Sequence, residues 1–195
     1  IIDTFKGNED VGIILKSNAG RSTILDYKNM QGIVTQTLKS LNHDGTPKVY
    51  LLHGHMSDSE LKSLYSSEKV KGLVSLTRGE GFGLPMLEAA ACGVPVIATK
   101  WSAHTEYMTG DSYLKIKYNL EKINKSRVDG SLFVEDMRWA EADEKCAKEC
   151  LEKIHKYYDV YKKRAVEHQS FIVENYNFES ISNRYSEHFK DLLCL

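Results

Sequence analysis

The chain has 195 residues, of which 42% are hydrophobic, and a formal net charge of -1. That length is enough for one domain with its own core and short for two. The balanced charge offers no electrostatic footprint for nucleic acid, which requires a basic excess gathered on one face. No apolar run approaches the roughly 20 residues that cross a bilayer, and the first residues do not form a signal peptide. We therefore expect neither a nucleic-acid partner nor a transmembrane segment.

The four cysteines do not have the pattern of a disulfide scaffold or a zinc site. They are Cys92, Cys146, Cys150 and Cys194, and no CxxC pair accompanies them. We interpret them as reduced thiols and predict no metal site and no cofactor. A cytoplasmic protein is expected, with a peripheral association of the full-length protein with membranes left open.

The first hundred residues alternate strand-like and helix-like segments. Short apolar runs predict strands, and apolar residues at helical spacing predict helices between them. In chain order these are a strand at 11–15, a helix at 30–41, a strand at 48–52, a helix opening at Ser57 or Asp58, a strand at 72–76, a helix from Pro85 to Gly93 and a strand at 95–99. This order predicts an α/β fold, a Rossmann-like parallel sheet with helices on both faces.

The last third of the chain has a helical composition. Residues 140–161 are rich in Glu, Lys, Ala and Leu, which predicts a long surface helix, and residues 169–193 predict one or two more. A break is expected at 175–177. The stretch 113–134 has the weakest pattern and is interpreted as an excursion loop.

The segment from Arg78 to Glu88 carries the candidate chemistry. Gly81 and Gly83 allow the backbone to approach a ligand closely, and the segment leads into a helix N-terminus that favours an anion. Glu80 precedes the glycines and Glu88 lies in the helix. Because carboxylates accept hydrogen bonds from paired hydroxyls, the pattern suits a sugar nucleotide. The alternative is a packing turn flanked by two ordinary surface glutamates.

The same segment, which reads Glu-Gly-Phe-Gly-Leu-Pro from Glu80, closely resembles the signature of family 4 glycosyltransferases. These are retaining enzymes with the GT-B fold. Their Glu-x7-Glu pair falls on Glu80 and Glu88, and their Ser-Arg ahead of it appears as Thr77-Arg78. The glutamate of their next loop falls on Glu106. The likeness extends over most of the chain.

The resemblance implies roles for individual residues. Glu88 would bind the ribose diol and Glu80 the transferred sugar, which makes these two the candidate catalytic residues. The other donor-binding candidates come from the glycine turn, the strand ends and the loop expected beside the base: Gly81, Phe82, Gly83, Leu84, Thr77, Arg78, Lys16, His53, Gly54 and Met56. For Lys16 and Arg78, two interpretations remain: a contact with the ligand, or a salt bridge or solvated side chain without a ligand role.

Three further side chains are weaker candidates. His55 forms a possible pair with His53, but without nearby Cys or carboxylate ligands a contact with the base is favoured over a metal. His104 and Trp101 stand in the loop before Glu106, where ligand contact and burial are both open.

By resemblance, the chain is the C-terminal half of a GT-B fold and the donor-binding domain of a retaining glycosyltransferase. Its partner would be a UDP-, GDP- or ADP-sugar, and the sugar would pass to an acceptor hydroxyl. We expect the domain over 1–160 and C-terminal helices over 161–195. The first strand, a cationic diphosphate clamp and the N-terminal acceptor domain are expected upstream, so the chain alone should show no transfer.

Two other functions stay open at this point. One is another GT-B activity, such as a sugar-nucleotide epimerase or a phosphorylase. The other is a non-catalytic sugar-nucleotide-binding or interaction domain with idle carboxylates.

Overall fold

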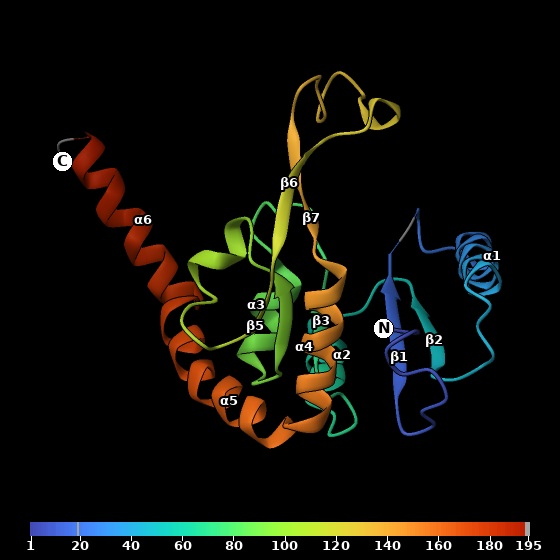
Figure 1. The fold of residues 1–195 in the computed structure, drawn as a ribbon. Coiled ribbons are helices and arrows are strands. Elements are labelled where there is room, and N and C mark those ends of the chain that lie inside the picture. Colours follow the sequence, from blue (N-terminus) through green and yellow to red (C-terminus); the bar gives the residue numbers. More distant parts are fainter. Residues whose placement is uncertain (19, 194–195) are drawn as a thin grey trace. The chain divides into compact units, whose positions relative to one another are not determined.

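The computed structural model describes residues 1–18 and 20–193, with side chains up to residue 190. The chain forms two compact units, Ile1–Leu61 and Lys62–Leu195, and each is described by itself (Figure 1). Cys92, Cys146 and Cys150 are free thiols, as predicted, and Cys194 lies outside the described residues.

The first unit is a strand–helix–strand repeat. β1 (Gly12–Ser17) pairs in parallel with β2 (Lys48–His53), and α1 (Ile24–Ser40) connects them. α1 begins earlier than predicted because Thr23 and Asp26 form a capping box ahead of the apolar positions. Apolar side chains of β1, β2 and α1 line a cavity of about 420 Å³ together with the first residues of the chain.

α2 (Asp58–Tyr65) begins where the sequence predicts it. The Ser57 hydroxyl accepts a hydrogen bond from the Glu60 amide at 3.4 Å, and the Glu60 carboxylate accepts one from the Ser57 amide at 2.8 Å. These reciprocal bonds satisfy amides that a helix start leaves without partners.

A three-stranded parallel sheet organises the second unit. Its order is β3 (Leu73–Ser75), β4 (Val96–Thr99) and β5 (Leu114–Ile116), and α3 (Leu84–Ala91) connects β3 to β4. Val96 and Ala98 belong to a core cluster with α3, while Ile97, on the opposite face by strand alternation, is also fully buried. α4 (Glu144–Lys156) packs against β4 and β5. Parallel strands with helices on both faces confirm the predicted α/β class.

The predicted helix over 140–161 is confirmed for most of its length, as α4 and the start of α5 (Tyr158–Asn175), but its first residues belong to a strand. Residues Arg138–Ala142 form β7, which pairs in antiparallel register with β6 (Tyr118–Lys122). Backbone pairing with a distant strand overrides the helical propensity of this composition. α4 then ends at Lys156, and the φ of -123° at the C-cap residue Tyr157 lies outside the helical region.

The region predicted as an excursion loop contains β5, β6 and the loop of the β6–β7 hairpin. This loop includes the short 3-10 helix η2 (Lys125–Arg127), and the hairpin extends away from the β3–β4–β5 sheet (Figure 1). The weak sequence pattern agrees with β6, which is mostly exposed to solvent, whereas Leu114 and Ile116 of β5 are buried.

Two helices complete the second unit, α5 (Tyr158–Asn175) and α6 (Phe178–Leu193). The predicted break between them is confirmed, and the Asn177 carboxamide oxygen accepts the Ser180 amide at 2.8 Å to cap α6. α5 packs on α3, because Ile172 joins the core cluster and Gln169 donates to the Ala91 carbonyl at 2.7 Å.

Candidate functional site

A left-handed glycine leads the chain from the candidate turn into α3. Gly83 is the N-cap residue of that helix and has a φ of +84°. A Cβ at this position would lie 2.8 Å from Met86 Cε, 2.9 Å from Tyr107 Oη and 3.0 Å from His104 Cβ. Both the torsion and the packing therefore require glycine. A Cβ at Gly81 would meet nothing within 4 Å, so this part of the turn faces open space.

Tyr107 holds the helix end of the turn. Its hydroxyl donates to the Gly83 carbonyl at 2.6 Å and to the Phe82 carbonyl at 3.1 Å. The side chain is fully buried, and burial raises its pKa; the charges of Glu80 and Glu88 act in the same direction. The hydroxyl thus stays a protonated donor, and both predicted carboxylates act on this one group.

Ser102 holds the other end of the turn. Its hydroxyl accepts a hydrogen bond from the Glu80 amide at 2.8 Å and donates one to the Glu80 carbonyl at 2.7 Å. Ser102 directly precedes the 3-10 helix η1 (Ala103–Glu106) and has a φ of +89°. A single side chain therefore fixes both peptide groups of Glu80.

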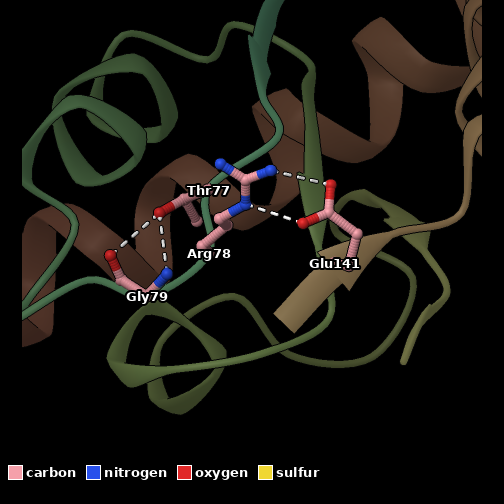
Figure 2. A network of polar contacts seen from close by, with 4 residues as sticks. All are labelled: Thr77, Arg78, Gly79 and Glu141. Carbon is pink, nitrogen blue, oxygen red and sulfur yellow. Dashed lines mark hydrogen bonds and ion pairs between the residues drawn. The ribbon is translucent and has the colours of Figure 1, made fainter. Parts of the chain in front are cut away.

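Arg78 is held against β7 by three consecutive residues. Its guanidinium makes a bidentate ion pair with Glu141, with Nε–Oε2 and Nη2–Oε1 distances of 2.7 and 3.0 Å (Figure 2). The same group lies 4.5 Å from the ring centroid of Trp139, and the Arg78 carbonyl accepts the Ala140 amide at 3.1 Å. Trp139 and Glu141 share one face of the strand. The Arg78 side chain lowers the pKa of Glu141 through its hydrogen bonds.

Thr77 stabilises the bend between β3 and the turn. Its hydroxyl donates to the Gly79 carbonyl at 2.9 Å and accepts the Gly79 amide at 3.2 Å (Figure 2). Of the two alternatives for Arg78, the structure shows the salt bridge. A ligand role for Thr77 or Arg78 stays a prediction.

Glu88 lies half-buried in α3, and its charge affects the pKa of a second tyrosine, Tyr65. Burial raises the pKa of Tyr65 to about 12, and the Glu88 carboxylate adds to that effect. The Tyr65 hydroxyl donates to the Pro85 carbonyl at 3.4 Å, in the first turn of the same helix.

The first unit brings together three of the predicted residues at the carboxyl ends of its strands. Lys16 donates to the Gly54 carbonyl at 2.5 Å, and the Gly54 amide donates to the Ser17 carbonyl at 3.0 Å. Gly54 has a φ of +110°, and the His53 ring lies 6.2 Å from the ring of Tyr27. Met56 follows in the same loop and is half-buried.

The weaker candidates of the 101–106 loop have structural contacts. His104 is fully buried, and its Nε2 lies 2.8 Å from the Thr99 carbonyl, which can only accept. The Trp101 ring packs 5.3 Å from that of Tyr118. Glu106 is exposed at the end of η1.

Sequence reasoning did not find Ser102, Tyr107 and Glu141 as partners of the turn. The sequence analysis places Trp101 in the loop before Glu106, but nothing in the local sequence identifies the partner of the Ser102 hydroxyl. The three bonds span 22, 24 and 63 positions of the chain, and no spacing rule of a helix or strand connects such pairs.

Comparison with protein families identifies the chain. Residues 34–153 match the family model described as "Glycosyl transferases group 1". The chain belongs to this family. The matched residues include the turn from Glu80 to Gly83.

The curated relative and the solved structures agree with this assignment. The chain is 35% identical over 116 residues to a probable sucrose-phosphate synthase of Thermosipho melanesiensis. The aligned region covers 51% of this chain and 26% of that protein. Anabaena HepE, solved with UDP and glucose, has a TM-score of 0.59 at 13% identity and covers 91% of this chain and 40% of that chain. The pneumococcal O-GlcNAc transferase GtfA, solved with UDP and GlcNAc, has a TM-score of 0.55 at 14% identity. That match covers 96% of this chain and 37% of the GtfA chain.

These likenesses establish the fold, which is that of GT-B glycosyltransferases. The chain spans well under half of the length of each of these relatives. Among residues 1–18 and 20–193, no helix combines the length and apolarity needed to cross a membrane.

Proposed function

We propose that the chain is the donor-binding half of a retaining, family 4 glycosyltransferase that transfers a sugar from a nucleotide-sugar to an acceptor hydroxyl. The observation that carries the proposal is the turn from Glu80 to Gly83. It follows a parallel strand, enters the N-terminus of α3, and lies where the charges of Glu80 and Glu88 act on one hydroxyl, that of Tyr107. Ligands of such sheets bind at the carboxyl ends of the strands.

The chemistry of a nucleotide-sugar fits these groups. Glu88 would accept hydrogen bonds from the ribose diol, and Glu80 with the turn amides would hold the transferred sugar. The diphosphate would lie near Leu84, where helix amides without intrahelical partners favour an anion. In the first unit, Lys16 and the loop from His53 to Met56 are proposed for the phosphates and the base.

Catalysis in this proposal depends on position and electrostatics. The domain aligns the anomeric carbon for attack from the same face and stabilises charge on the departing diphosphate. The proposal assigns no carboxylate as a nucleophile, in contrast to retaining hydrolases, where one of two carboxylates attacks. The proposed reaction needs no metal.

A longer protein would complete the enzyme. The chain spans 26% of the curated relative and 40% of HepE. We propose that the acceptor site and the main diphosphate cations come from other parts of such a protein, and that residues 161–195 form helices that pack on the donor domain or cross to the acceptor domain. The isolated chain then binds donor without transferring sugar.

Titration calorimetry with UDP, GDP, ADP and UDP-glucose tests the proposal. UDP is the first probe because HepE and GtfA were solved with it. Glu88→Gln should weaken binding of the preferred nucleotide about tenfold or more, since a bond to a charged acceptor is lost. Glu187→Gln, at an exposed position of α6, is the matched control.

Two results would contradict the proposal. An interaction domain would bind none of the nucleotides, or would bind them equally well with Glu88→Gln. A longer form that interconverts UDP-sugars, or releases a sugar phosphate without an acceptor product, would indicate an epimerase or a phosphorylase.

A further inference from the structure

Ser102 adopts a backbone conformation that side chains rarely tolerate. Its φ of +89° and ψ of -173° fall in a region populated almost only by glycine. Such strain persists where surrounding contacts over-determine it, and it gathers at functional sites. A glycine would be relaxed at this position, so the torsion alone does not account for a serine.

The serine hydroxyl has a specific use. It accepts from the Glu80 amide at 2.8 Å and donates to the Glu80 carbonyl at 2.7 Å. A hydroxyl has one donor, and here that donor and one acceptor position serve the same residue. Because the two peptide groups on either side of the Glu80 Cα are held, the direction of the Cα–Cβ bond is fixed as well.

The segment that carries Ser102 is itself fixed. The Thr105 amide and hydroxyl both donate to the Ser102 carbonyl, at 3.1 and 2.8 Å. Five residues after Ser102, Tyr107 holds the carbonyl of Gly83. The segment from Ser102 to Tyr107 therefore holds the glycine turn at both ends through hydrogen bonds.

We propose that Ser102 is a positioning residue, whose hydroxyl aims the Glu80 carboxylate at the transferred sugar. This inference rests on the proposed function, in which Glu80 contacts the sugar and Glu88 the ribose. Ser102 would then contribute to binding of the sugar moiety and leave binding of the nucleoside diphosphate unchanged.

The test compares UDP with UDP-glucose by calorimetry in wild type, Ser102→Ala and Ser102→Gly. In the wild type we expect UDP-glucose to bind more tightly than UDP. Both variants should lose most of that difference, about tenfold, while UDP affinity changes by less than about twofold. Ser102→Gly separates the hydroxyl from the backbone, because it relieves the torsion but cannot make the two bonds. Amide exchange supplies a readout without ligand: the Glu80 amide should lose protection in both variants.

Ser112→Ala is the matched control, since the Ser112 hydroxyl is buried and has no hydrogen-bond partner among the described residues. If both Ser102 variants keep the wild-type difference in affinity between UDP and UDP-glucose, this inference is wrong, and the proposed function is not affected. Equal losses for UDP and UDP-glucose would overturn it too, since they indicate general disruption. If the wild-type chain binds no nucleotide, the proposed function fails, and this inference with it.

Discussion

Arg78 and Glu141 are 63 positions apart in the chain, and their side chains meet in a two-bond ion pair of 2.7 and 3.0 Å. The pair ties the segment before Glu80 to the β6–β7 hairpin, and the Trp139 ring supports the guanidinium from the same strand. The β6–β7 hairpin, which is distant in the sequence, therefore helps to hold the candidate turn.

A double-mutant cycle measures this connection. The partners are 51% and 39% exposed, so solvent screens the pair, and we expect a coupling free energy of unfolding of about 0.5–1 kcal/mol between Arg78→Ala and Glu141→Ala. The coupling should shrink at high salt. The more exposed pair Lys163 and Glu167, 3.9 Å apart, should give a coupling near zero. No coupling at low salt between the first two residues would refute the role of this ion pair.

Gly83→Ala should strongly destabilise the second unit. The substitution adds a Cβ at a φ of +84° within 3.0 Å of Met86, Tyr107 and His104. We expect a loss of about 2 kcal/mol or more in the free energy of unfolding, measured by urea denaturation. Gly81→Ala meets nothing within 4 Å and is the control, with a change of less than about 1 kcal/mol. Equal effects at the two positions would contradict the described packing.

Tyr107→Phe removes the hydroxyl that two carbonyls of the turn share. Because that group is buried, the Gly83 and Phe82 carbonyls lose a donor, and we expect a loss of about 1–3 kcal/mol in the free energy of unfolding. Tyr185→Phe, at an exposed site on α6, should leave stability unchanged. A Tyr107→Phe variant as stable as wild type would show that water or a rearranged turn replaces the bond.

His104 should make the unfolding free energy depend on pH. Burial lowers its pKa, against smaller opposing effects of the Thr99 hydrogen bond and the Glu80 charge. The folded state then binds the proton less readily than the unfolded state, whose histidines titrate near about 6.5. Stability is therefore complete above that pH and falls as the pH drops below it. Burial lowers the pKa of His168 in the same direction.

Urea midpoints at pH 7.5 and 5.5 check this expectation. His104→Gln should lose less stability between the two pH values than wild type does, although it is less stable at pH 7.5. His188→Gln, exposed on α6, is the control and should follow the wild type. A His104→Gln variant with the full wild-type loss would assign the pH dependence to other groups.

Much of the fold follows from local rules that the sequence displays. Ser57 and Asn177 cap helices because their side chains reach amides three residues away, within a single turn. The parallel strands are readable because apolar, β-branched runs repeat between helical segments. The helix predicted over 140–161 begins later than predicted for the opposite reason: the Arg138–Ala142 segment pairs with Tyr118–Lys122, and the local composition does not predict that pairing.

In the candidate site, too, some features follow from local sequence and others from contacts between distant segments. The sequence by itself determined the turn, its glycines and its two carboxylates, since a left-handed torsion and a helix start are properties of neighbouring residues. Only the tertiary structure decided that Ser102, Tyr107 and Glu141 hold that turn. Hydrogen bonds and ion pairs act over a few ångströms, so their partners are set by where the folded backbone brings distant segments together.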